Sequence, residues 1–447
     1  MKNNRIYQIL TPVFFIFLSL LIFYSILKNF FFSDDFSWVF RAKSELVTFY
    51  DFIFIRFAGF LRSTVNFYFF ILYKLFGVQP LYYYFVSILI HGLNGFLVYS
   101  LVKNCVNSKK VGLLAGVIFL TLFCHMEAVV WISAVTALLE TLFALLVLNL
   151  FWNYLKNRKL LYYFLSFFFF IFALLTKESS SVLFGLIFCE LLLFYKLNKI
   201  DINWKDFLVI LAPFISVLVF YLFIQYSFFS HNLGIYNYSY HVNFISVGLL
   251  FYNSIFLFFD FKFWWISLSL FLVLIILLIL KIKKDKQYLK QIYFFGVWIL
   301  ICYLPVIFFS LGERSLHFAS RYNYFPSVAS AAIIAVLFYL IYKTSHGYEK
   351  VFVFVILAGF IFVNMFQIKT GINSYSKFGQ ISKSVYLSIE ELKNAGHLNN
   401  NVFIVGDFPF SHNQPYLFDI LRLAEVSDNK IHFKPDKNFK SFKDSAL

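Results

Sequence analysis

Residues 6–32 read IYQILTPVFFIFLSLLIFYSILKNFFF, and residues 265–280 read WISLSLFLVLIILLIL. Neither run alternates apolar with polar side chains, as a strand of a transmembrane barrel would. Similar apolar runs of about 20 residues recur along the chain, and they are too long and too frequent for the core of a soluble domain. Because a chain in lipid must satisfy its backbone hydrogen bonds internally, these runs predict a polytopic α-helical membrane protein.

The composition of the 447-residue chain agrees with this prediction. Apolar residues make up 61% of the chain and charged residues 13%, which is about half of the charge that soluble domains carry. The net charge of +16 would suggest nucleic acid in a soluble protein, but many of these cations lie in short loops between apolar runs. We therefore attribute the charge to membrane topology and expect no nucleic-acid partner.

The apolar runs predict about eleven transmembrane helices in an all-α domain that occupies residues 1–367. They are expected at residues 6–32, 81–102, 111–125, 132–153, 160–176, 179–196, 207–227, 263–281, 291–310, 327–343 and 351–367. The first run lacks a small-residue cleavage site, which predicts an uncleaved span. Six segments expected inside hold 18 Lys or Arg, whereas the longer outer segments before the tail hold ten. This bias predicts a protein of the inner or plasma membrane with its N-terminus inside.

Three further segments are expected on the outer side. Residues 49–76, in the first outer loop (residues 33–80), and residues 244–259 are apolar but do not fit as spans, so we expect interfacial or re-entrant helices. Residues 368–447 are polar and predict a small soluble α/β domain, with a helix over 374–395, a strand over 401–410 and a short helix over 415–425.

Asp34 and Asp35 follow the first span directly. Two adjacent carboxylates at a lipid boundary are costly unless they are solvated, paired or bound to a metal. Their mutual repulsion can raise the pKa of one of them, which suits a general base. The stretch DDFSWVFR then brings aromatic rings, which suit sugar surfaces, and Arg41, which suits phosphate. The alternative is a solvated helix end.

The use of arginine gives an independent indication. The chain has 30 Lys but only 8 Arg, and five of the eight fall on outer segments before the tail: Arg41, Arg56, Arg62, Arg314 and Arg321. Lys is the common cation of this chain. Arg at these places therefore indicates that a planar guanidinium is required, which can donate two parallel hydrogen bonds to a phosphate or a carboxylate. The alternative is pairing with a carboxylate or snorkelling at the interface.

Four stretches, in this order, resemble the GT-C superfamily of membrane glycosyltransferases, especially the protein O-mannosyltransferase-like branch and the membrane portion of the TMTC proteins. They are Asp34-Asp35, FGVQP (76–80) leading into IHGLNG (90–95), HMEAVVWIS (125–133) followed by TKES (176–179), and SRYNYFPS (320–327). Together they cover most of residues 1–330.

This resemblance implies an inverting hexosyl- or pentosyltransferase that takes a sugar from a polyprenyl-phosphate donor. The acceptor would be a hydroxyl of a protein, lipid or glycan at the outer membrane face. It implies that an acidic residue of the first outer loop activates the acceptor. We favour Asp34 as this base, with Asp35 holding a divalent cation, the acceptor or a helix end.

The other candidate site residues lie on predicted outer turns, where we expect them to contact the phosphate or the sugar of the donor: Arg41, Arg62, His125, Glu127, Lys177, Glu178, Arg314, Arg321, Tyr322 and Tyr324. A charged turn at Lys177-Glu178 and an interfacial anchor at Arg321 are the alternatives. His125 and Glu127 could ligate a metal or contact the sugar, but two residues are too few for a metal site, so a hydrogen-bonded turn is favoured. His91, in mid-span, is expected to be a buried packing residue.

Three other classes of function compete with this one. A transporter or flippase predicts charges at mid-membrane and often a repeat, but here the charges gather at the outer face and no repeat is seen. A polysaccharide polymerase or ligase of the cell envelope would need no acidic pair after the first span. The third is a non-catalytic scaffold. No P-loop, dinucleotide glycine pattern or HExxH motif appears, and the four scattered cysteines are expected to be buried free thiols.

Overall fold

The computed structural model describes residues 2–57, 60–198, 200, 203–229, 288–305, 320–395, 402–406 and 431–435. Their helices are α1 (Lys2–Phe23), α2 (Asp35–Ser44), α3 (Phe49–Phe54), α4 (Ser63–Phe76), α5 (Pro80–Val106), α6 (Lys109–Thr121), α7 (Met126–Val130), α8 (Val135–Asn157), α9 (Leu160–Leu174), α10 (Leu183–Asn198), α11 (Trp204–Phe229), α14 (Leu289–Tyr303), α15 (Ser327–Thr344) and α16 (Tyr348–Asn394). Short 3-10 turns are η1 (Tyr24–Lys28), η2 (Phe123–His125), η3 (Ile132–Ala134), η4 (Glu178–Val182) and η8 (Ser320–Asn323). The strands are β1 (Arg56–Phe57), β2 (Phe60–Leu61), β3 (Val402–Gly406) and β4 (Ile431–Pro435).

The prediction of an all-α polytopic membrane protein is confirmed. Seven of the described helices are long and apolar enough to cross a membrane, or up to eight if α6 and the bent segment after it form one broken span. Two shorter apolar helices, α9 and α14, complete the set. Ten of the eleven predicted spans coincide with a described helix, and the other, residues 263–281, lies outside the described residues, as does the segment 244–259. The count of eleven therefore stays a prediction.

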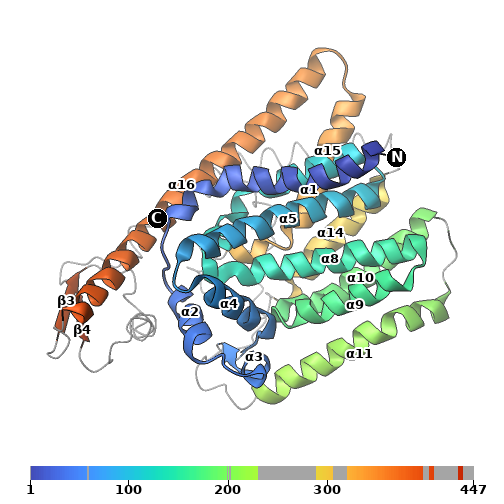
Figure 1. Ribbon diagram of the computed structural model, residues 1–447. Coiled ribbons are helices and arrows are strands. Elements are labelled where there is room, and N and C mark those ends of the chain that lie inside the picture. Colours follow the sequence, from blue (N-terminus) through green and yellow to red (C-terminus); the bar gives the residue numbers. More distant parts are fainter. Residues whose placement is uncertain are drawn as a thin grey trace.

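The helices α1, α5, α8, α9, α10, α14 and α15 form a bundle, with α11 on its flank (Figure 1). Helix α5 contacts α1, α6 and α8, and glycines allow the closest of these approaches. A Cβ on Gly92 would lie 2.6 Å from the Cα of Ile16 in α1, and one on Gly116 would lie 2.7 Å from the carbonyl oxygen of Gly95. Small residues at helix crossings are typical of packing in a membrane, where close backbone contact replaces the hydrophobic effect.

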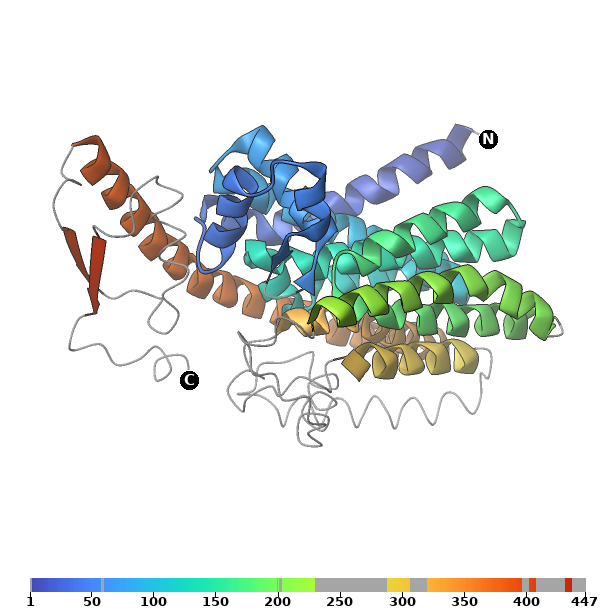
Figure 2. The same ribbon diagram turned by 90° about the horizontal axis from the view of Figure 1, so that it is seen from below.

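In the described part of residues 49–76, no helix meets the length and hydropathy of a span. These residues form α3, the antiparallel hairpin of β1 and β2, and α4. Helix α4 packs against α2, so that α2, α3 and α4 make a folded cap at one end of the bundle (Figure 2). This cap holds the acidic pair against the ends of the spans.

Helix α16 differs from the prediction, because the last span and the helix expected over 374–395 are one continuous helix of 47 residues. At 1.5 Å per residue it is about 70 Å long, and the domain boundary expected at residue 368 falls inside it. Strand β3 lies where a strand was predicted, and it pairs in parallel with β4. The predicted helix over 415–425 lies outside the described residues, so the α/β domain stays a prediction.

The four cysteines are free thiols, as expected. Three of them are buried and Cys189 is partly buried.

Candidate functional site

Four loop segments and one long helix meet at the end of the bundle that carries the α2–α4 cap. Consecutive spans alternate in direction, so the chain returns to this end after α1, between α6 and α8, between α9 and α10, and before α15. Contacts join α2 to η3, α7 to η8, and α16 to α7. Residues far apart in the sequence are therefore brought together here, and we call this region the loop end.

Asp35 is the anchored member of the acidic pair. Its side chain is fully buried, and its Oδ1 accepts hydrogen bonds from the backbone N–H of Ser133 (2.8 Å) and the hydroxyl of Ser133 (2.6 Å). Its Oδ2 accepts a bond from the backbone N–H of Phe32 at 3.2 Å. Both oxygens thus have partners, and Asp35 ties the start of α2 to the turn that precedes α8.

Asp34 is the open member of the pair. It is partly exposed, and its Oδ1 has no hydrogen-bond partner among the described residues. Burial raises the pKa of Asp34 to about 6, although Ser133, Arg321 and Arg62 act in the opposite direction. Burial and the charge of Asp34 together raise the pKa of Asp35 to about 8. Burial and mutual repulsion favour the protonated form of one of the two carboxyls, and Asp34, which has an oxygen without a described partner, is the better placed to accept a proton.

Arg321, in η8, binds Glu127, in α7. Its backbone N–H donates to Glu127 Oε2 (2.8 Å), and its guanidinium donates to Glu127 Oε1. The guanidinium carbon also lies 4.9 Å from the ring centroid of Trp131 and 5.1 Å from that of Tyr322. This planar cation is therefore fixed by a carboxylate and two rings, a combination that arginine provides and lysine does not.

Lys177 is held by an acid that the sequence analysis did not select. Its Nζ lies 3.0 Å from Glu140 Oε2, and the hydroxyl of Ser179 donates to the other oxygen of Glu140. Lys177 is only 6% exposed. Its Nζ is also 5.1 Å from the ring centroid of Tyr322, which Arg321 contacts as well, so the two cations lie within about 10 Å of each other.

The remaining predicted arginines differ in their surroundings. Arg62 Nη2 lies 3.2 Å from both carboxylate oxygens of Glu178, so two predicted site residues are paired with each other. Arg41 pairs with Glu45 one turn later in α2, at 3.0 Å. This pairing with a carboxylate is the alternative considered for the outer arginines. Arg314 lies outside the described residues.

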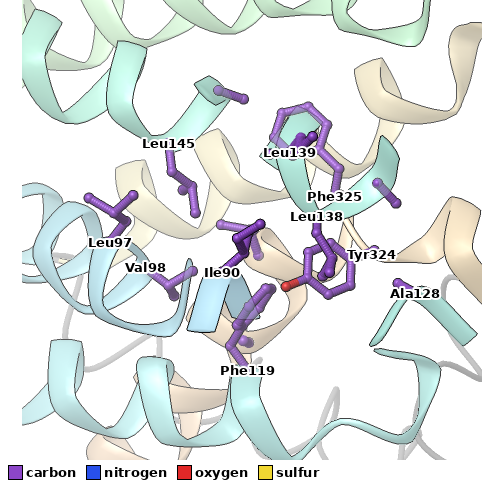
Figure 3. Close-up of a cluster of buried hydrophobic side chains, with 14 of the residues drawn as sticks. Ile90, Leu97, Val98, Phe119, Ala128, Leu138, Leu139, Leu145, Tyr324 and Phe325 are labelled. Atoms are coloured by element: carbon purple, nitrogen blue, oxygen red, sulfur yellow. The ribbon is translucent and has the colours of Figure 1, made fainter. Parts of the chain in front are cut away.

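His125 and Tyr324, two of the residues expected to contact the donor, have their hydrogen-bond partners within the protein. Both are fully buried. His125 Nε2 lies 2.6 Å from the Ser327 hydroxyl, and the Tyr324 hydroxyl lies 2.7 Å from Nδ1 of His91 and 3.1 Å from the amide nitrogen of Asn94. Figure 3 shows Tyr324 within a cluster of buried apolar side chains. Tyr324 directly follows η8. We regard both residues, like His91, as packing residues.

Three residues of this region were not predicted as site residues from the sequence: Glu140, Trp131 and Ser133. Glu140 lies within a predicted span, and a charged residue inside a span is itself an indication of a functional or paired site. Trp131 and Ser133 belong to the stretch HMEAVVWIS, whose two titratable members alone were selected. Trp131 contacts Arg321, and Ser133 binds Asp35. Both partners are distant in sequence, so no local sequence pattern could predict these contacts.

The fit of a divalent cation to the acidic pair is incomplete. Asp34 offers one oxygen without a partner, whereas both oxygens of Asp35 accept hydrogen bonds. Among the described residues, no group of three or more His, Cys, Asp or Glu is gathered as metal ligands. A cation at Asp34 would need water or substrate to complete its coordination, and we derive no step through it.

The fold and the site define a class: a polytopic helical membrane protein with an acidic pair and ion-paired cations collected at one end of its bundle. No family model and no curated protein sequence matches the chain. In fold the chain is similar to the archaeal oligosaccharyltransferase AglB from Archaeoglobus fulgidus, in complex with an inhibitory peptide and a dolichol-phosphate. The TM-score is 0.51 at 10% identity, over 96% of this chain and 65% of that chain.

A second structure of the A. fulgidus oligosaccharyltransferase, in complex with Zn and sulfate, gives a TM-score of 0.48 at 12% identity, over 95% of this chain and 62% of that chain. The chain thus spans 65% of the length of AglB in the first comparison. At 10% identity this similarity shows a shared fold alone, and membership of the GT-C superfamily stays a prediction.

Proposed function

We propose that the chain is an integral-membrane glycosyltransferase that moves a sugar from a polyprenyl-phosphate donor to an acceptor hydroxyl at the outer membrane face. The observation that carries the proposal is the position of Asp34, which has an oxygen without a described partner and lies within electrostatic reach of Arg321 and Arg62. The AglB structure contains a dolichol-phosphate, so this fold can hold the phosphate of a polyprenyl lipid.

In the proposed reaction Asp34 is the general base. The acceptor oxygen forms a bond to the anomeric carbon of the sugar while its proton passes to Asp34. The bond from the anomeric carbon to the phosphate oxygen breaks, and the lipid phosphate leaves with the electron pair. A single displacement of this kind inverts the anomeric centre. Asp35, whose oxygens are engaged, fixes the start of α2 and thereby orients Asp34.

The leaving phosphate would be stabilised by Arg321 and Lys177. Arg321 is partly exposed, with 28% of its side-chain surface accessible, whereas Lys177 is nearly buried. Arg321 would therefore contact the phosphate directly, and Lys177 would add positive charge from behind the ring of Tyr322. Cations fixed in advance by Glu127 and Glu140 need little reorganisation as charge develops, which is how such groups accelerate transfer.

The arrangement in the membrane is part of the proposal. The excess of Lys and Arg on the other set of loops favours that side as the cytoplasmic one, so the loop end would face outward. Sugar nucleotides are cytoplasmic, which favours a lipid-linked donor.

The first experiment uses purified wild-type protein and the variant Asp34→Ala/Asp35→Ala. Each is incubated with a panel of polyprenyl-phosphate sugars and a mixture of hydroxyl acceptors, and the loss of donor is followed by mass spectrometry. We expect one donor to be consumed by the wild type and none by the variant. If the wild type neither consumes nor binds any of these lipids, the proposal is wrong and a transporter or scaffold becomes the better hypothesis.

A further inference from the structure

A continuous row of stacked side chains runs past the acidic pair, and α16 supplies its last member. In order it contains Lys177, Tyr322, Arg321, Trp131, Phe32 and Phe378. The two cations occupy one end, next to Tyr322. At the other end the ring centroids of Trp131 and Phe32 are 6.3 Å apart with planes at 22°, and those of Phe32 and Phe378 are 6.2 Å apart with planes at 28°.

A second aromatic residue of α16, Tyr375, lies beside the same end of the row. Its ring centroid is 5.7 Å from that of Phe32 and 6.0 Å from that of Phe378. Tyr375 also lies close enough to Glu127 and Arg321 for both charges to act on it. The long helix therefore places two rings within the region of the ion pair and the acidic pair.

Helix α16 reaches this position through specific contacts with two loops. Asn364 accepts a hydrogen bond from the backbone N–H of Phe123 at 2.9 Å. Gly371 faces Met126 and Gly379 faces Asn29, and at both glycines a Cβ would overlap the facing side chain. The polar half of α16 thus packs against the loop that carries Glu127 and against the loop that precedes the acidic pair.

We propose that Trp131, Tyr375 and Phe378 form an aromatic wall that stacks on the sugar ring of the donor. This inference rests on the proposed function and adds α16 to the donor site. In a polyprenyl-phosphate sugar the phosphate is bonded directly to the sugar, so the site needs a cationic surface adjacent to an aromatic one. The contact of Arg321 with Trp131 provides this junction. Aromatic faces suit the C–H surfaces of a sugar as guanidinium suits phosphate.

The exposure of the rings agrees with this role. Trp131, Tyr375 and Phe378 are each partly exposed, whereas Phe32, which contacts all three rings, is 6% exposed. Phe32 contacts the three rings of the wall and precedes Asp34 by two residues, so the wall and the proposed base lie close together. Other rings of α16, such as Phe362 at 70% exposure, lie on its apolar span and provide a matched control.

The test measures the affinity of the purified protein for a polyprenyl phosphate with and without its sugar. The donor is the one that the wild type consumes. The ratio of the two dissociation constants reports the contribution of the sugar. We expect Tyr375→Ala to reduce this ratio about five- to tenfold and to leave the affinity for the bare polyprenyl phosphate unchanged. Tyr375→Phe, which keeps the ring, should retain the wild-type ratio, and so should Phe362→Ala.

Phe378→Leu serves as a second variant, because it keeps apolar volume and removes the ring, and we expect it to reduce the ratio as well. An equal loss of affinity for both lipids would overturn the proposal and make the wall a purely structural feature. An unchanged ratio with a raised KM for the acceptor would also overturn it, since the wall would then contact the acceptor. If the wild type binds neither lipid, the proposed function itself fails.

Discussion

Two asparagines in the middle of the bundle bind main-chain carbonyls, whereas charged side chains at the loop end form ion pairs with one another. In the middle, the amide of Asn94 donates to the carbonyl of Leu138 (3.0 Å), and the amide of Asn149 donates to that of Leu97 (3.1 Å). At the loop end there are three ion pairs, and the arginines of two of them, Arg321 and Arg62, act on the pKa of Asp34.

This difference indicates that the middle of the bundle stabilises the fold and that the loop end binds the ligand. Hydrogen bonds from an amide to a neighbouring helix are satisfied within the protein and have no charge to offer a ligand, so they hold the bundle together. Ion pairs can exchange a partner for a phosphate without leaving the site. The middle therefore fixes the positions of the span ends, and the loop end keeps charged groups available. Substitutions in the two regions should have correspondingly different effects.

The largest expected effect is on catalysis at Asp34. Asp34→Asn should reduce transfer by about 10²–10⁴-fold, because the amide cannot accept the acceptor proton. Below pH 6, where the Asp34 carboxyl is neutral, its unfolding temperature in detergent should stay near that of the wild type, since the replaced Oδ1 has no described partner. The rate of donor consumption and a thermal melt measure the two quantities. An active Asp34→Asn enzyme would exclude this residue as the base.

Two variants in the same loop serve as controls. Asp35→Asn should lose about 1–3 kcal/mol of folding free energy, because its amide nitrogen would face the N–H of Phe32 or the donors of Ser133. Asp51→Asn alters an exposed carboxylate that caps α3 with Thr48, and transfer should be unchanged.

The next effect is on stability, at the buried pair of Glu140 and Lys177. Glu140→Leu leaves the lysine buried without its carboxylate, and we expect a loss of about 3–5 kcal/mol. The double variant Glu140→Leu/Lys177→Met should recover most of this loss but not the transfer activity. Denaturant unfolding in detergent measures the change. A control is Glu45→Leu, whose pair with Arg41 is partly exposed and should be worth less than about 1 kcal/mol. If the two single variants lose equal stability, the buried pair has no special role.

These two regions also differ in how far the sequence predicts them. The spans follow from apolar runs, because their length and hydropathy are local properties of the chain. The residues of the loop end were largely selected too, since Asp34, Glu127, Lys177 and Arg321 are unusual on predicted outer turns. Their pairing was not predicted, because it depends on which loops the packed spans bring together. The position of Tyr375 has the same origin, as it depends on α16 continuing beyond its span.

A smaller effect is expected on donor binding at Arg321. Arg321→Lys keeps the charge but loses the planar group that contacts Trp131 and Tyr322, so the KM for the donor should rise about tenfold. The KM for the acceptor should not change. Steady-state kinetics with each substrate varied in turn separates the two. Arg62→Lys, at a pair outside the stacked row, is the matched control, and an equal effect there would remove the special role of Arg321.

The acidic pair also predicts opposite responses of activity and stability to pH. Transfer should fall as the pH drops through about 6, because Asp34 is then protonated and cannot act as a base. The pKa values of both carboxyls are raised in the folded protein, so their contribution to stability is fully present below about 4 and is lost as the pH rises through about 6 and about 8. Thermal melts of the wild type and of Asp34→Asn/Asp35→Asn between pH 4 and 9 measure this contribution. A wild-type curve that matches the curve of the variant would contradict it.

The smallest effect is expected at Glu190, the residue that most challenges the division between the two regions. It lies in the middle of α10, is fully buried, and has no described hydrogen-bond partner on either carboxylate oxygen. Replacing such a group by an apolar side chain removes an unsatisfied polar group, so Glu190→Leu should change stability by less than about 1 kcal/mol or increase it. Transfer should be unchanged, because the loop end keeps all its charges. Loss of activity with normal stability would instead show that a charge in the middle of the bundle is functional, as a transporter requires.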